Sequence, residues 1–311
     1  MTKNNWDIYE RIYSSHWFLT SYNAQGFGFD FPAMGGGSFM TQAVYVMEKG
    51  MCRYIFDSDE FERAAQYTSD RLINDDKWRE NVYQNINLYT RRYFAAGERL
   101  RKTPLDTLSH GELVKIVREI IPLQHYHQVY SVLANGVVLD GRNHLSDRIR
   151  EELRSLMGSP DDFDEQWSLL SQSAKMSLRQ RKEHAIAQLA SESKVTSRVV
   201  ERKLRNLHQK YCWLDYNNMG PAASFEKFEQ ELAEARSQNK NITLKEELKA
   251  LRKKQIDLMR RLRISQRGKF LIRLAQGVIW QKGYRKDMQY HGFYCYENLF
   301  RELARRQNTP D

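Results

Sequence analysis

Apolar residues along most of the chain recur at steps of three and four positions, which is the period of a helix with one buried face. Trp78, Val82, Ile86, Tyr89 and Tyr93 follow this period within one segment. The same period dominates from residue 58 onward. The pattern therefore predicts a chain that is mostly α-helical.

Capping residues mark where several of these helices should begin. Ser109 with Glu112, and Ser159 with Asp162, form capping boxes, in which a hydroxyl and a carboxylate three residues later satisfy free helix N–H groups. The helix expected after Thr243 carries a leucine stripe that Gln255 interrupts. That interruption favours a helix within a domain over a long coiled coil.

The first 57 residues lack the helical period. Residues 16–40 combine glycine with aromatic residues, and residues 42–57 form two short β-type runs around the turn sequence Glu48-Lys49-Gly50. We therefore expect a mostly α, multi-helix fold with a small N-terminal β-hairpin or sheet element. The expected parts are a Gly/aromatic-rich segment with the β element (1–57), a helical body (58–239) and a basic helical C-terminal part in the same domain (240–311).

Charge is distributed unevenly along the 311 residues. The chain has 49 Lys and Arg against 39 Asp and Glu, a net charge of +10, and residues 240–311 hold 18 basic against 7 acidic side chains. The rest of the chain is therefore close to neutral. A basic helical end suits phosphate, nucleotide, nucleic acid or an acidic partner, although a solvated helix face has the same composition.

Cellular compartment and thiol chemistry follow from what the sequence lacks. The N-terminus has no apolar core of the signal-peptide type, and no run approaches the roughly 18 apolar residues of a membrane span. Cys52, Cys212 and Cys295 are scattered, without a C-x-x-C spacing. We expect a cytoplasmic protein without a membrane segment, whose three reduced cysteines are packing residues.

Two local motifs give little support to metal or phosphate-loop chemistry. His125 and His127 lie two positions apart, so on a helix they point about 200° away from each other and cannot share a metal. The glycines between residues 26 and 37 lack the Gly-Lys-Ser/Thr of a phosphate loop. The sequence predicts no metal site.

Two denser clusters are candidates for a ligand site. The first precedes a Gly-Pro turn and contains His208, Tyr211, Trp213, Asp215 and Tyr216. Aromatic rings beside a carboxylate and an imidazole suit a ligand pocket, but the same rings also make core packing.

The second cluster interleaves basic and aromatic residues between positions 280 and 294. It includes Arg285, Lys286 and His291, and Arg273 precedes it by about two helical turns. This composition suits phosphates and stacked rings, whereas a helix face with snorkelling cations over a core looks similar.

The order of segments resembles the helical middle region of phosphoenolpyruvate-utilising enzymes related to PEP synthase and pyruvate phosphate dikinase. The similar segments are VYVMEKGMCRYIFD, PLDTLSHGELVKIV, HQKYCWLDYNNMGPAASFEKFEQEL and QRGKFLIRLAQGVIWQKGYRKDMQYHGFYCYENLFRELARR. In that family an ATP-grasp module phosphorylates a histidine on a swivelling domain, which carries the phosphate to an acceptor module. No ATP-grasp segment is visible here, and SSHWFLT around His16 lacks the glycines, alanine and arginine of the phosphohistidine motif.

The resemblance implies a substrate-binding or accessory component of a PEP-synthase-like phosphotransfer system, acting on a small-molecule acceptor. It implies no firmly bound cofactor; ATP or a phosphohistidine carrier would act through separate ATP-grasp and swivelling partners. In this hypothesis His208 or His291 acts as a base. Tyr211, Trp213, Asp215 and Tyr216 hold the acceptor, and the phosphoryl charge is neutralised by Arg273, Arg285 and Lys286.

Two alternatives come from other functional classes. A basic helical nucleic-acid-binding protein would use residues 240–306 as an electrostatic surface. A stand-alone enzyme would reuse the family scaffold for different chemistry.

Overall fold

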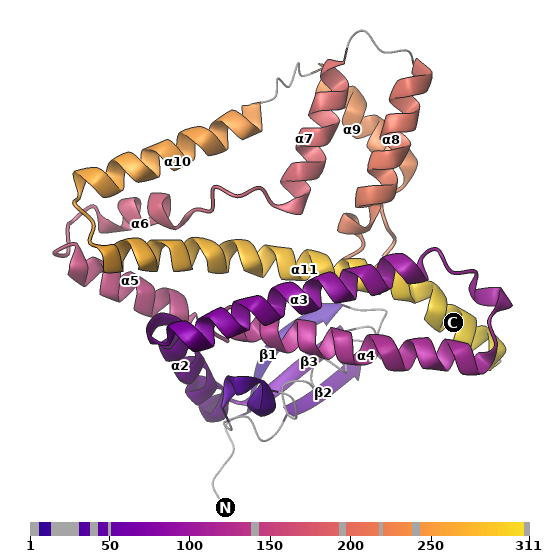
Figure 1. The fold of residues 1–311 in the computed structure, drawn as a ribbon, viewed down its shortest axis with the longest axis horizontal. Helices are drawn as coiled ribbons and strands as arrows, with labels where there is room; N and C mark the ends of the chain where they lie inside the picture. The colour runs from indigo at the N-terminus through magenta and orange to yellow at the C-terminus, as the bar shows by residue number, and fades with distance from the viewer. Residues whose placement is uncertain are drawn as a thin grey trace, which may run out of the picture. The chain divides into compact units, whose positions relative to one another are not determined.

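The computed structural model describes residues 6–13, 31–37, 43–48, 51–137, 143–192, 197–217, 220–237 and 243–307. Most of the Gly/aromatic-rich stretch and the turn at residues 49–50 lie outside these ranges. The elements, labelled as in Figure 1, are β1 (Trp6–Tyr13), a short π-helical turn η2 (Pro32–Gly36), β2 (Ala43–Glu48), β3 (Met51–Asp57), α2 (Ser58–Asn74), α3 (Asp76–Leu100), η3 (Leu105–Thr107), α4 (His110–Leu133), α5 (His144–Leu156), α6 (Phe163–Ser171), α7 (Leu178–Ser191), α8 (Ser197–Tyr211), η4 (Cys212–Asp215), α9 (Phe225–Ser237), α10 (Thr243–Arg261) and α11 (Gln266–Arg306).

The predicted fold class is confirmed: the chain is mostly α-helical, with one small sheet near its N-terminus. Strands β2 and β3 form the expected antiparallel hairpin, in register from Ala43 opposite Phe56 to Glu48 opposite Met51. Strand β1, which the sequence pattern did not single out, pairs with the other edge of β3, so the strand order is β1-β3-β2. Alternate residues of β3 are buried, as a half-buried strand requires.

The chain divides into two compact units. Unit 1 comprises residues 1–149 and 291–311, and unit 2 comprises residues 150–290. Helices α5 and α11 contribute to both. This division cuts across the three segments suggested by composition, because the last part of α11 belongs with the N-terminal elements.

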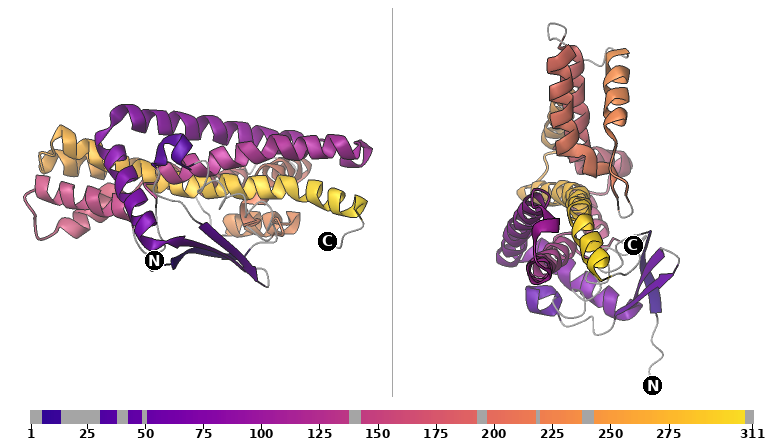
Figure 2. Two further views of the ribbon diagram at one scale, coloured as in Figure 1. Left: turned by 90° about the horizontal axis from the view of Figure 1, so that it is seen from below. Right: turned by 90° about the vertical axis from the view of Figure 1, so that its right-hand side faces the viewer.

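In unit 1, helices α3 and α4 run side by side, and strand β3 contacts α2 (Figure 2). Asp57 and Asp75 cap α2 and α3, each accepting hydrogen bonds from N–H groups of the following turn. Ser109 and Glu112 form the predicted capping box of α4. Pro122 does not end α4, which continues to Leu133.

In unit 2, helices α7, α8 and α9 stand together (Figure 2). Gln255, which interrupts the leucine stripe of α10, is buried. Its Nε2 donates to the carbonyl oxygens of Leu169 and Gln172, at 2.9 and 2.8 Å. Gln276 of α11 donates to the carbonyl of Leu170. These amides satisfy carbonyls at the C-terminus of α6 that have no partner within the helix.

The expected start of α6 at Ser159 is wrong by several residues, since the helix begins at Phe163. Ser159 has a φ of 52°, and its N–H donates to the carbonyl of Arg154. It therefore closes the end of α5 and is not available to cap α6. No helix among the described residues is both long and apolar enough to cross a bilayer.

Candidate functional site

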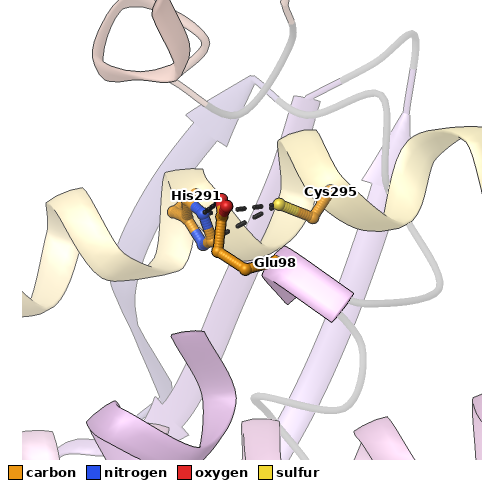
Figure 3. A group of neighbouring side chains, drawn as sticks. All are labelled: Glu98, His291 and Cys295. Atoms are coloured by element: carbon orange, nitrogen blue, oxygen red, sulfur yellow. Dashed lines mark hydrogen bonds and ion pairs between the residues drawn. The ribbon is translucent and has the colours of Figure 1, made fainter. Parts of the chain in front are cut away.

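Three chemically reactive side chains meet in unit 1 (Figure 3). Helix α3 provides Glu98, and α11 provides His291 and Cys295. The spacing of four residues places His291 and Cys295 on the same face of α11. His291 is 0% exposed and Cys295 3%, whereas the Glu98 side chain is 28% exposed. The cluster is thus buried on one side and reachable through the carboxylate.

The three donor atoms lie close to one another. His291 Nε2 is 2.9 Å from Glu98 Oε1. Cys295 Sγ is 3.5 Å from the same Nε2 and 3.8 Å from Nδ1. All three residues offer an atom within 4.8 Å of the others. Phe94 stacks on the imidazole at a centroid distance of 4.2 Å and limits how the ring can turn.

Two glycines allow α3 and α11 to approach closely at this point. A Cβ at Gly97 would lie 3.1 Å from both Cys295 Sγ and His291 Cε1. A Cβ at Gly292 would lie only 2.0 Å from the hydroxyl oxygen of Tyr93. Each helix therefore has a glycine that leaves room for side chains of the opposite helix.

The electrostatics of the cluster favour a neutral imidazole and an ionised carboxylate. Burial lowers the pKa of His291, although the hydrogen bond to Glu98 opposes this. The hydrogen bond to His291, helped by the charge of Arg101, lowers the pKa of Glu98. Arg101 Nη2 lies 3.3 Å from Glu98 Oε2, so the two carboxylate oxygens have different partners.

The first sequence-predicted cluster lies in unit 2, and its aromatic members are core residues. Tyr211, Trp213 and Tyr216 are buried. Trp213 Nε1 donates to the carbonyl of Lys210 at 2.8 Å. His208 Nε2 lies 2.9 Å from the carbonyl oxygen of Ala223, which fixes the loop before α9. The structure brings these residues together, and there they pack around the Gly-Pro turn.

Asp215, the acidic member of that cluster, has two cationic partners. Arg179 Nη1 is 3.0 Å and Lys227 Nζ 2.9 Å from its two carboxylate oxygens. Burial alone would raise the pKa of Asp215, but the hydrogen bond from Lys227 and the nearby positive charges lower it. Asp215 is therefore an ionised member of a charge network.

The second cluster lies on α11, and its unit 2 members include an unusual arginine. Arg285 is 8% exposed; among the described residues its guanidinium has no acidic partner, and its buried Nε has no acceptor. Gln281, one turn earlier on the same face, is 4% exposed, and its buried Nε2 also has no acceptor. Arg273 is exposed and Lys286 half-buried.

An aromatic pair occupies the neighbouring row of α11. The Trp280 and Tyr284 rings stack at a centroid distance of 4.7 Å. Lys175 Nζ lies 3.2 Å from the centre of the Trp280 ring. Trp280 Nε1 donates to the carbonyl of Met176, which fixes the ring against the loop before α7.

Sequence reasoning selected His291 and included Asp287 in the second cluster, but it missed Glu98, Cys295 and Gln281 as site residues. Asp287 is 7% exposed, and burial raises its pKa to about 6 against the opposing charge of Arg179. The four-residue spacing of His291 and Cys295 could have indicated that the two side chains lie on the same face of a predicted helix. No local signal marks Glu98, which is 193 positions away from His291.

The two candidate bases, His208 and His291, belong to different units. Comparisons of the chain with protein-family models, with curated proteins and with solved structures found no match.

Proposed function

We propose that the chain is a cytoplasmic substrate-binding or accessory component of a PEP-synthase-like phosphotransfer system, and that unit 2 binds an anionic, phosphate-bearing small molecule at α11. The observation that carries this proposal is Arg285, which is 8% exposed, has no acidic partner in the described chain and has a buried Nε without an acceptor. A buried charge is costly unless it is paired. A phosphate or carboxylate from outside the chain would supply the missing partner.

The neighbours of Arg285 suit the same ligand. Gln281 lies on the same helix face, and its amide Nε2 has no acceptor in the part of the chain that the structure describes. Amide and guanidinium donors together bind phosphate oxygens. The neighbouring row of α11 adds a further cation, because the Lys175 ammonium lies over the Trp280 ring that stacks on Tyr284. His208 is engaged with the Ala223 carbonyl, so the proposal does not depend on it.

Direct titration of the full chain tests the ligand class. We expect phosphoenolpyruvate, ATP or pyrophosphate to bind by calorimetry, and Arg285→Gln to weaken that binding at least tenfold. Arg261→Gln is the matched control, because Arg261 is an exposed arginine of unit 2 outside the proposed site. Equal losses in both variants would indicate a general effect of positive charge and would contradict a built site.

A transfer assay tests the system. Labelled ATP, a purified ATP-grasp protein, a phosphohistidine carrier and candidate acceptors should give label transfer that requires this chain and is lost with Arg285→Gln. Transfer that proceeds equally well without the chain would refute the accessory role.

A second candidate, nucleic-acid binding, is favoured by one specific observation. Helix α10 carries exposed cations with no ion pair among the described residues: Lys245, Lys249, Arg252, Lys253, Lys254 and Arg261. If they contact a nucleic-acid backbone, log K should fall with log salt by roughly 0.7 to 0.9 per phosphate neutralised. The triple variant R252Q/K253Q/K254Q should reduce that slope, and no retention on DNA or RNA at low salt would exclude this function.

A further inference from the structure

We propose that Glu98, His291 and Cys295 bind a divalent transition metal, and that Zn²⁺ is the ion that best fits them. This site lies in unit 1 and is independent of the anion site proposed for unit 2. A carboxylate oxygen, an imidazole nitrogen and a thiolate sulfur are the three kinds of ligand that zinc takes in proteins. The sulfur disfavours Mg²⁺ and Ca²⁺, which prefer oxygen donors.

Two of the donor–donor distances can be compared with those around a zinc ion. Tetrahedral zinc with ordinary bond lengths separates its nitrogen and sulfur ligands by about 3.6 Å, and its nitrogen and oxygen ligands by about 3.4 Å. His291 Nε2 and Cys295 Sγ are already 3.5 Å apart. Glu98 Oε1, at 2.9 Å from Nε2, must withdraw by about 0.5 Å. Its partly exposed side chain can make this small adjustment.

The arrangement differs from a nucleophile–base–carboxylate triad. In a triad, the imidazole faces the nucleophile with one ring nitrogen and the carboxylate with the other. Here the nearest ring nitrogen to both Glu98 Oε1 and Cys295 Sγ is Nε2. Donors that converge on one side of the ring are expected around an ion, where each contributes one lone pair to the centre.

The surroundings supply what a metal site needs beyond its ligands. Arg101 approaches Glu98 Oε2, which orients the carboxylate and leaves Oε1 for the metal. Gly97 leaves space beside Sγ and the imidazole, and the exposed edge of Glu98 gives the ion a route from solvent. Three protein ligands leave a fourth position for water or another ligand.

Cobalt substitution tests the site in the full chain. After treatment with a chelator, titration with Co²⁺ should produce the visible bands of four-coordinate cobalt and a thiolate-to-cobalt charge-transfer band, saturating at one ion per chain, and Zn²⁺ should displace them. Cys295→Ser should lose the charge-transfer band. Cys212→Ser, which changes another buried thiol, should keep it.

Glu98→Gln keeps the test decisive if Cys295→Ser does not fold, because Glu98 is partly exposed and its replacement should leave the helical circular dichroism unchanged. This variant should weaken Co²⁺ binding at least tenfold, whereas Arg285→Gln should bind Co²⁺ normally. An absent charge-transfer band in the wild-type chain, or one equally strong in Cys295→Ser, would overturn the proposal. Either result would leave the anion site of unit 2 unaffected.

Discussion

Replacing Gly292 by alanine should destabilise unit 1, although alanine is the better helix former. The added methyl group would lie 2.0 Å from Tyr93 Oη, 2.2 Å from Cζ and 2.5 Å from Cε1. Carbon atoms in normal contact are about 3.5–4.0 Å apart. The Tyr93 ring must therefore move by more than an ångström. It cannot do so freely, because it is fully buried and packed against His127 and Tyr296.

The expected magnitude follows from two opposing contributions. Overpacking of a core usually costs about 1–3 kcal/mol, and three close contacts with a rigid ring place this case at the upper end. The change from glycine to alanine within a helix returns about 1 kcal/mol. The net loss is about 2 kcal/mol, which for a unit of this size lowers the melting temperature by roughly 4–8 °C.

Thermal and urea unfolding, followed by circular dichroism, measure this loss. Gly277→Ala and Gly283→Ala are matched controls on the same helix, since an added Cβ meets no atom within 4 Å at either position. Both should be neutral or stabilising by up to about 1 kcal/mol. In a Tyr93→Ala background, Gly292→Ala should cost little, because the clash has been removed. If Gly292→Ala were as stable as Gly277→Ala, the close approach of α3 and α11 would be refuted.

Three further predictions concern unit 2. Gln255→Leu should cost about 1–3 kcal/mol in urea unfolding, because two carbonyls at the end of α6 lose their donor, and an unchanged midpoint would contradict the capping role. Burial raises the pKa of Asp287 from 3.8 to about 6, so the cost of ionising this buried side chain is absent below pH 4 and destabilises the fold as pH rises through 6. Asp287→Asn should therefore raise the free energy of unfolding by up to about 3 kcal/mol at pH 7 and leave it unchanged at pH 3.5. A gain in stability that does not depend on pH would show that ionisation of Asp287 is not its cause. Lys182→Met breaks the 2.8 Å ion pair of a buried ammonium with Glu231, and should cost more than the double variant K182M/E231Q, a difference that double-mutant unfolding free energies would detect.

The sequence predicted the helices best where their ends depend on local contacts. Asp57 and Asp75 cap helices close to the positions that the apolar period indicated, because capping involves only neighbouring residues. The start of α6 was misplaced because Ser159 could either cap α6 or close the end of α5. In the structure its N–H donates to the Arg154 carbonyl, so it closes α5. The sequence does not decide between such alternatives.

The candidate site was only partly predictable for a related reason. His291 and Cys295 share a helix face, so their proximity follows from the helical period. Glu98 joins them only because Gly97 and Gly292 let two distant helices approach, and this depends on tertiary packing. Likewise, the basic and aromatic composition around Arg285 was visible in the sequence, but only the structure shows that its buried Nε has no acceptor among the described residues.

Unit 1 is assembled from the beginning and the end of the chain, and this has a consequence for its synthesis. The ribosome must add residues 150–290, all of unit 2, before the last part of α11 appears. At about 5–20 residues per second, this takes roughly 10–30 s. During that interval, the face of α3 that carries Tyr93 and Gly97 lacks the helix that covers it. The nascent protein therefore holds an apolar surface open for many seconds, and its yield in cells should depend on chaperones that bind such surfaces.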